Sequence, residues 1–226
     1  MQMYLEVIVE RLKDAIDAER YGANRLELVS AISEGGLTPS SGLIESVCES
    51  VSIPVQVMLR PHAESFVYDA DDRKVIMKDL ERIKHTNVQG IVFGCLKEDG
   101  TIDETLLKQI IKHKGHLQVT FHRAVDEARD YFQAINTLLN HDIDTILTSG
   151  GLDTAYVGRE NLRSIKEKLE KRDVELLAGK GLNVDTIDAL YQKTGIDHVH
   201  VGSGVKTNRR IDPEKVALIK AIGNSH

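Results

Sequence analysis

The sequence predicts an α/β fold, a single (β/α)8 TIM barrel of parallel strands with outer helices, over all 226 residues. Its length lies in the range of compact barrels of this type. Short β-branched apolar runs alternate along the chain with charged segments of helical periodicity, which implies parallel strands joined by right-handed crossovers. Eight such units favour a closed barrel over an open doubly wound sheet, which is the alternative architecture. The eight runs are residues 5–10, 25–29, 54–59, 90–96, 117–122, 144–149, 174–179 and 198–203.

The segments between these runs predict helices and one long loop. Residues 104–113 and 157–172 place apolar side chains at helical spacing. No low-complexity linker interrupts the chain, so we expect one domain over residues 1–226, frayed from about Gly223. The longest irregular stretch, residues 60–72, follows the third strand, where barrels carry the loops of their active face. This loop is a candidate lid.

Composition excludes several classes of partner. The chain is 41% hydrophobic and 28% charged, with a net charge of −6, so it offers no overall attraction to nucleic acid or to an anionic membrane. The N-terminal apolar run is too short for a signal peptide, and no run is long enough to span a bilayer. Two cysteines, Cys48 and Cys95, are too few for a disulfide framework and fit a reducing cytoplasm. No nucleotide cofactor is indicated.

Strand phase predicts an unusually polar barrel interior. Successive strand residues alternate between the interior and the helix layer, and the apolar phase should face the helices. The inward phase is then polar in most strands: it contains Glu6, Arg25, Glu27, Gln56, Arg60, Gln118, Thr120, His122, Glu175, His198 and His200, together with the apolar Ile8, Met58 and Leu177. Buried charge is costly unless it is paired or solvated in a pocket, so this set forms either a structural ion network or a functional site.

A functional pocket at the C-terminal ends of the strands is the favoured interpretation of that set. Converging carboxylates and imidazoles supply acid and base, and guanidinium groups supply an anion clamp. The candidate catalytic residues are Glu6, Glu27, His122 and His200. Arg60 and Arg123 are the candidate clamp for an anionic small molecule.

Glycine-rich turns provide further candidate anion sites. The turns AGKGL and VGSGV follow the last two strands, where barrels of this fold commonly bind phosphate, so Gly179, Gly181 and Ser203 are candidates. Ser149 in the TSGG turn is a similar candidate. Ordinary use of glycine in turns explains these sequences equally well.

The segment SEGGLTPSSGLI after the second strand predicts a tight turn followed by a helix. Gly35 and Gly36 permit the turn, and Thr38 is expected to cap a helix that begins at Pro39. The N-terminus of such a helix could hold an anion.

Spacing typical of a metal site is absent from the sequence. There is no CxxC pair and no HxxxH within a predicted helix. Met58, Cys95, His122 and His200 are the nearest approach to the soft ligand set that copper(I) prefers, but they come from four different strands. Cys95 is more simply explained as a small core residue.

Collinear motifs along the chain resemble the CutC family from about residue 4 to about residue 205. They are RLEL before EGGLTPS, the RP after the third strand with FVY behind it, VTFHRA, LTSG, and the closing GxG and HxxS turns. The resemblance implies a TIM barrel and a cytoplasmic role in copper homeostasis, with copper as candidate cofactor and a homodimer as candidate assembly. The positions that match the family pattern are Glu6, Glu27, Arg60, His122, Arg123 and Ser149.

The chain also departs from that pattern. Val29 and Val201 stand where family members often carry cysteine, and these thiols would be plausible copper ligands. The third loop has RPHAESFVY where members tend to have RPRGGxFxY, so His62 and Glu64 replace an arginine and a glycine pair. Two functions follow: a copper-handling protein, or an enzyme acting by acid/base chemistry on a small anionic, phosphorylated or sugar-like metabolite. A non-catalytic scaffold would leave the polar interior unexplained.

Overall fold

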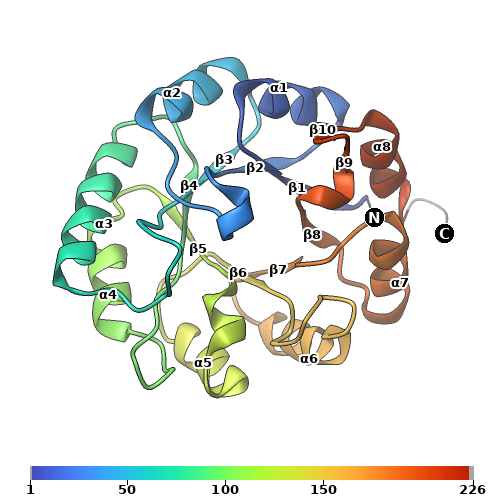
Figure 1. Ribbon diagram of the computed structural model, residues 1–226. Coiled ribbons are helices and arrows are strands. Elements are labelled where there is room, and N and C mark those ends of the chain that lie inside the picture. The colour runs from blue at the N-terminus through green and yellow to red at the C-terminus, as the bar shows by residue number, and fades with distance from the viewer. Residues whose placement is uncertain (1, 224–226) are drawn as a thin grey trace.

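The computed structural model describes residues 2–223, and in it eight parallel strands close into a barrel in sequence order (Figure 1). The predicted (β/α)8 fold is confirmed, and the open-sheet alternative is wrong. Each strand lies on one of the predicted apolar runs. The strands are β1 (Tyr4–Val9), β2 (Arg25–Leu28), β3 (Val55–Met58), β4 (Gly90–Phe93), β5 (Gln118–Phe121), β6 (Thr145–Thr148), β7 (Glu175–Gly179) and β8 (His198–Val201).

Eight helices surround the barrel within the described chain (Figure 1). They are α1 (Leu12–Tyr21), α2 (Ser41–Ser50), α3 (Ala70–Ile83), α4 (Glu104–His113), α5 (Tyr131–Leu138), α6 (Arg159–Leu169), α7 (Val184–Thr194) and α8 (Pro213–Ala221). The loops also contain three short 3₁₀ turns and a small two-stranded ribbon. The turns are η1 (Ile32–Glu34), η2 (Arg123–Glu127) and η3 (Ser203–Val205), and the ribbon consists of β9 (Lys206–Thr207) and β10 (Arg210–Ile211). The fraying expected from about Gly223 falls mostly on residues 224–226, which lie outside the described residues.

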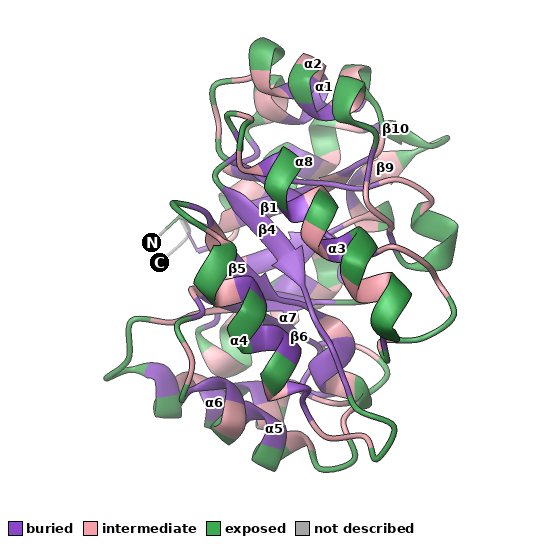
Figure 2. Cartoon of the chain, turned by 90° about the vertical axis from the view of Figure 1, so that its left-hand side faces the viewer, coloured by how far each residue is buried: buried purple, intermediate pink, exposed green. Residues whose placement is uncertain are grey.

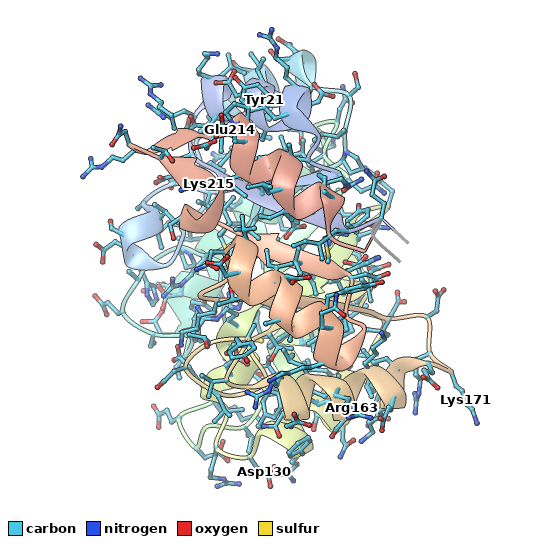
Figure 3. The ribbon with its side chains drawn as sticks, turned by 90° about the vertical axis from the view of Figure 1, so that its right-hand side faces the viewer. Tyr21, Asp130, Arg163, Lys171, Glu214 and Lys215 are labelled. Atoms are coloured by element: carbon cyan, nitrogen blue, oxygen red, sulfur yellow. The ribbon has the colours of Figure 1, made fainter. Side chains whose placement is uncertain are left out.

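The main apolar core lies between the strands and the helices. In β1 the outward phase of Leu5, Val7 and Val9 is fully buried, and the neighbouring helix α1 buries Ala15 and Ala18 in the same core. Figure 2 shows the strands buried while the outer helix faces are exposed. Charged side chains of the last helices project outward (Figure 3). No helix among residues 2–223 is both long and apolar enough to cross a membrane.

The segment after β2 differs from its prediction at the helix start. The tight turn forms, since Gly35 and Gly36 both have positive φ. However, α2 begins at Ser41, and its cap is Ser40, whose hydroxyl accepts from the Leu43 N–H at 3.3 Å. The predicted cap at Thr38 and start at Pro39 are therefore wrong.

Thr38 is occupied elsewhere. Its hydroxyl accepts from the Arg60 N–H at 2.9 Å and donates to the Arg60 carbonyl at 3.1 Å. This pairing extends the chain beside the end of β3 and delays the helix. The candidate lid after β3 is also shorter than predicted, because Asp69 caps α3 and residues 70–72 are helical.

The strand register stacks the inward side chains in layers of four from alternate strands, as in other TIM barrels. The layer nearest the middle contains Glu27, Val92, Leu147 and His200. Glu6 lies one layer toward the N-terminal ends of the strands. Met58 and His122 lie one layer toward the C-terminal ends. The predicted inward phase thus holds; Glu6, Arg25, Glu27, Arg60, His122 and His200 are buried, whereas Glu175 and His198 are partly exposed.

Candidate functional site

His200 lies between two glutamates at the centre of the barrel. Its Nδ1 is 2.6 Å from Glu6 Oε1, and its Nε2 is 3.5 Å from Glu27 Oε2. The β1–β8 register sets His200 directly beside Glu6, and Glu27 comes from β2 on the other side of β1. All three side chains are buried. The structure therefore brings together three of the four predicted catalytic residues.

A buried ion network continues from this cluster toward the N-terminal end of the barrel. Arg25 Nε donates to Glu6, and Arg25 Nη1 and Nη2 donate to Glu175 at 3.2 and 2.7 Å. His198 Nδ1 is 3.4 Å from Glu175 Oε1. Charged groups thus run along the barrel interior from Glu27 to His198. The interior therefore contains a structural ion network toward its N-terminal end, and the functional-site interpretation of Glu6, Glu27 and His200 stays a prediction.

The cluster contains one carboxyl that is difficult to ionise. Burial raises the pKa of Glu27 to about 7, although His200 opposes the shift. Burial would also raise the pKa of Glu6, but Arg25 and His200 outweigh burial and lower it. Burial would lower the pKa of His200, but Glu27 and Glu6 together raise it above its usual value. The two glutamates thus favour the charged imidazolium form of His200, and Glu27 is the group that can exchange a proton near neutral pH.

On the C-terminal side of this cluster, the side chains of Arg60 and His122 both contact the ring of Phe66. The Arg60 guanidinium lies 4.7 Å from the Phe66 ring centre, and the His122 ring lies 4.9 Å from the same ring. His122 Nδ1 accepts from the Ala124 N–H at 3.1 Å, which leaves the ring proton on Nε2. Burial, assisted by Arg60, lowers the pKa of His122 to about 3. His122 is accordingly a neutral hydrogen-bond donor, a role different from the predicted acid or base.

Several buried polar atoms in this half of the barrel have no hydrogen-bond partner among residues 2–223, among them Tyr68 Oη and Arg123 Nε, the latter 3.3 Å from the Asp126 carboxylate. Three others are Glu27 Oε1, Arg60 Nε and His122 Nε2. Each belongs to a predicted site residue. A buried polar group left unsatisfied costs roughly 1–3 kcal/mol, so native proteins rarely retain one without a ligand or an ordered water. The three atoms define the candidate site at the C-terminal end of the barrel.

Glycines make room for these side chains. A Cβ on Gly94 would lie 2.4 Å from His122 Nδ1, and one on Gly179 would lie 3.2 Å from His200 Cδ2. A Cβ on Gly35, in the turn after β2, would lie 3.0 Å from Arg60 Nη1. Gly179, predicted as part of a phosphate seat, therefore has a packing role against His200.

Two other residues predicted to bind an anion, Ser149 and Arg123, contact a carboxylate of the chain itself. Ser149 is fully buried, and the TSGG turn already holds a carboxylate, because Asp126 accepts from the Ser149 and Gly151 N–H groups at 3.0 Å each. Arg123 Nε lies 3.3 Å from the same carboxylate. Asp126 was missed because it lies outside the strand phase. The carboxylate fills the place that the sequence suggested for a ligand.

The loop after β7 contains a strained residue. Lys180 has a φ of 83° and lies between Gly179 and Gly181, and Gly181 has a φ of 70°. Ser203 begins η3 after β8 and is exposed. These two loops lie on the predicted face, but the hydroxyl of Ser203 is not part of the buried cluster.

The four candidate soft ligands for copper do not come together. Cys95 belongs to the core on the helix side, where its Sγ donates to the Asp103 carbonyl at 3.4 Å and burial raises its pKa well above the usual value. Met58 packs with Val29 and Val92 in a small apolar cluster inside the barrel. In residues 2–223, the one group of histidine and acidic side chains close enough to share a metal ion is Glu6, Glu27 and His200.

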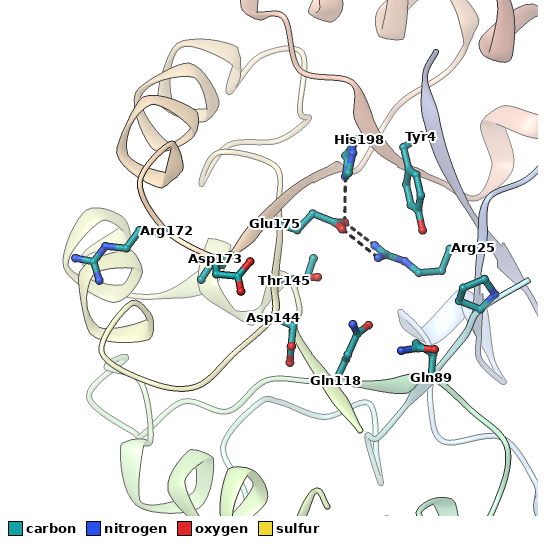
Figure 4. Close-up of a pocket in the computed structure, with 12 residues that line it drawn as sticks. Tyr4, Arg25, Gln89, Gln118, Asp144, Thr145, Arg172, Asp173, Glu175 and His198 are labelled. Carbon is teal, nitrogen blue, oxygen red and sulfur yellow. Dashed lines mark hydrogen bonds and ion pairs between the residues drawn. The ribbon is translucent and has the colours of Figure 1, made fainter. Parts of the chain in front are cut away.

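Two cavities lie at opposite ends of the barrel. One of about 440 Å³ lies among the loops after β3 and β4, where the candidate lid supplies His62 and Asp72, whose side chains are 3.1 Å apart. A larger one of about 650 Å³ opens at the N-terminal ends of the strands (Figure 4). The sequence predicted a pocket only at the C-terminal end, so this second cavity was not anticipated.

Comparison with known proteins places the chain in a family. The CutC family model matches residues 3–205. The family protein CutC of Aliivibrio fischeri is 37% identical over 221 residues, covering 97% of this chain and 87% of that protein. The "Copper homeostasis protein cutC homolog" of Homo sapiens is 37% identical over 196 residues, covering 87% of this chain and 71% of that protein.

Solved structures share the same fold. The putative copper homeostasis protein CutC from Streptococcus agalactiae superposes with a TM-score of 0.83 at 24% identity, covering 92% of this chain and 99% of that one. Phosphoribosyl anthranilate isomerase from Thermococcus kodakaraensis superposes with a TM-score of 0.66 at 16% identity, covering 99% of this chain and 100% of that one. These likenesses show the barrel. The family model and the identity to both relatives establish that the chain belongs to the CutC family.

Proposed function

We propose that this protein serves copper homeostasis, the role named for its human relative, through a site for a small hydroxylated anion at the C-terminal end of the barrel. The observation that carries this proposal is the set of unsatisfied buried atoms Glu27 Oε1, Arg60 Nε and His122 Nε2. Burying them without a partner is unfavourable, and a ligand that bonds to them removes that cost.

The chemistry of these atoms selects the ligand. Arg60 and neutral His122 both offer N–H donors, and Arg60 carries a positive charge, so their natural partner is an anionic oxygen. Arg123 adds a second positive charge near Glu27 and His122. Glu27 Oε1 accepts a hydrogen bond, which a hydroxyl of the same ligand can donate. A phosphorylated or otherwise anionic sugar-like metabolite has both groups.

The Glu27–His200 pair supports acid/base chemistry on such a ligand. With a pKa of about 7, Glu27 is present in both protonation states near neutral pH and can take up or release a proton. Glu6 stays ionised because Arg25 binds it, and it fixes the orientation of the His200 ring through Nδ1. His200 then stabilises the Glu27 carboxylate once Glu27 has lost its proton.

The residues present do not fit a thiolate site for copper(I). Copper(I) prefers sulfur ligands, yet Met58 and Cys95 lie on opposite sides of the sheet and the thiolate form of Cys95 is disfavoured. The Glu6, Glu27 and His200 group offers only oxygen and nitrogen. We therefore assign the copper-related role to the metabolite chemistry of the site. Both cysteines are unpaired, which supports a cytoplasmic location.

A thermal-shift screen with phosphorylated sugars and hydroxy acids tests the proposal. We expect one compound to stabilise the wild type and not the Arg60→Ala/Arg123→Ala variant. At a concentration about 100 times Kd, binding contributes about 2.7 kcal/mol, or a rise in Tm of roughly 5–10 °C for a domain of this size. Arg163→Ala/Lys171→Ala removes two exposed positive charges, one on α6 and one shortly after it (Figure 3), and serves as the matched control. No stabilising anion, or equal stabilisation of the Arg60/Arg123 variant, contradicts the proposal.

Copper(I) titration tests the alternative. We expect no tight stoichiometric site. Tight one-to-one binding that the Met58→Leu/Cys95→Ser variant loses would establish copper handling by this chain and overturn the metabolite assignment.

A further inference from the structure

We propose that the N-terminal mouth of the barrel is a second binding site, which takes a small neutral hydroxylated molecule such as a polyol or monosaccharide. The cavity there measures about 650 Å³, within the range of about 300–1,000 Å³ typical of small-molecule sites. It lies on the opposite end of the barrel from Glu27, Arg60 and His122. The proposal is therefore independent of the proposed function.

The charged groups in the floor of this cavity neutralise one another. Arg25 is bound by Glu6 and by both oxygens of Glu175, and its side chain is only 5% exposed. Figure 4 shows Glu175 between His198 and Arg25, with its carboxylate directed at the guanidinium. A charged ligand would have to compete with these internal pairs. An uncharged ligand leaves them intact.

The rim further disfavours an anion. Among the lining residues the carboxylates Asp144, Asp173 and Glu175 outnumber the guanidinium groups of Arg25 and Arg172. Lys114 lies 3.5 Å from Asp144, so the rim is close to neutral and has no excess positive charge to attract an anion, unlike the C-terminal site with Arg60 and Arg123.

The neutral groups of the cavity are the ones available for hydrogen bonding. The Thr145 hydroxyl makes no hydrogen bond within the described chain. Gln118 uses only its carbonyl oxygen, which accepts from Gln56 at 3.3 Å and leaves its amide N–H groups unused. The Tyr4 hydroxyl points into the same space beside the Arg25 guanidinium (Figure 4). Burial raises its pKa although Arg25 opposes the shift, so it remains protonated and able to donate. Donors and acceptors without net charge match the hydroxyl groups of a polyol.

One wall of the cavity is flat and aromatic. The Tyr4 and His198 rings stack with centroids 4.6 Å apart and an interplanar angle of 23°, and the Arg25 guanidinium lies 5.3 Å from the Tyr4 ring centre. These contacts hold Tyr4 in place while its hydroxyl faces the cavity. Replacing Tyr4 by phenylalanine removes the hydroxyl and keeps the ring, and Thr145→Val is similarly close in shape.

Saturation-transfer NMR with myo-inositol, D-glucose and D-glucose 6-phosphate tests the inference. We expect at least one neutral probe to bind the wild type. Loss of two hydrogen bonds in the Tyr4→Phe/Thr145→Val variant should weaken that binding by about tenfold or more, while Arg60→Ala should not change it.

Three outcomes overturn the inference. One is the absence of any signal from both neutral probes, and another is a signal that the Tyr4→Phe/Thr145→Val variant retains in full. The third is a signal lost in Arg60→Ala and kept in Tyr4→Phe/Thr145→Val, since it locates the probe at the C-terminal end. Failure of the anion screen at the C-terminal site would leave these results unaffected, so the two proposals fail separately.

Discussion

Glu6 and Glu27 contact the same imidazole, yet their pKa values shift in opposite directions. Glu6 lies 2.6 Å from His200 Nδ1 and also binds Arg25, which lowers its pKa. Glu27 lies 3.5 Å from Nε2, has one oxygen without a partner, and has its pKa raised by burial. Two carboxyls whose environments separate their pKa values are characteristic of acid/base sites. The difference arises because Glu6 binds both Arg25 and His200 directly, whereas Glu27 feels the charge of Arg25 without binding it.

Glu27→Gln should change how stability depends on pH. The folded-state pKa of Glu27 is about 7, above the ordinary value of 4.5, so the folded wild type holds this proton more tightly than the unfolded chain. Its stability should therefore fall as pH rises from about 4.5 to about 7, by a contribution that the variant lacks. Urea unfolding of both proteins across this range measures the difference. A constant difference between the two curves would contradict the raised pKa.

Glu175→Gln should destabilise the fold strongly. It removes a partner of buried Arg25, and breaking a buried ion pair costs roughly 3–5 kcal/mol, here toward the lower figure because Glu6 still binds the guanidinium. The pKa of Glu175 is lowered to about 2 by His198 and Arg25 against the effect of burial, so its contribution is present above pH 4.5 and lost toward about 2. The loss measured at neutral pH should shrink in acid.

The matched control for that variant is Glu167→Gln. Glu167 pairs with Arg163 on the exposed side of α6, where both side chains are more than half exposed. A surface pair of this kind contributes about 0–1 kcal/mol. Equal losses for the two variants would show that the Arg25 network has no special role in stability.

Gly94→Ala should disturb His122. The added Cβ would lie 2.4 Å from His122 Nδ1, so the ring must move or the strand must shift, at a cost of roughly 1–3 kcal/mol. Gly42 at the start of α2 has open space around its Cβ position, so Gly42→Ala should be neutral or stabilising by up to about 1 kcal/mol. Thermal unfolding and the His122 ring resonances measure both effects. An unchanged His122 environment in Gly94→Ala would exclude the close packing described here.

Strand phase predicted most of the candidate site. Alternation alone places Glu6, Glu27 and His200 inside the barrel, because one face of each strand must meet the helices. Strand alternation predicts only whether a side chain points into the barrel or toward the helices. It could not show that His122 is neutral, since that depends on the Ala124 N–H and on burial.

The interactions of loop residues were harder to predict from the sequence. Asp126 satisfies the turn that contains Ser149, and Thr38 pairs with Arg60 rather than capping a helix. Both interactions join loops that follow different strands, so no local pattern encodes them. The N-terminal cavity was missed for a related reason: periodicity cannot show which end of a barrel is filled by side chains.

The pKa of Glu27 tests the account most directly. Carbon NMR of glutamate side-chain carboxyls, with Glu27→Gln to assign the resonance, follows this group through a pH titration. We predict that Glu27 titrates with a midpoint of about 7. We expect an anionic ligand bound at Arg60 and His122 to shift the pH of this midpoint. A midpoint at or below the ordinary 4.5 would contradict the account, because Glu27 would then be fully ionised at neutral pH and could not exchange a proton with a ligand.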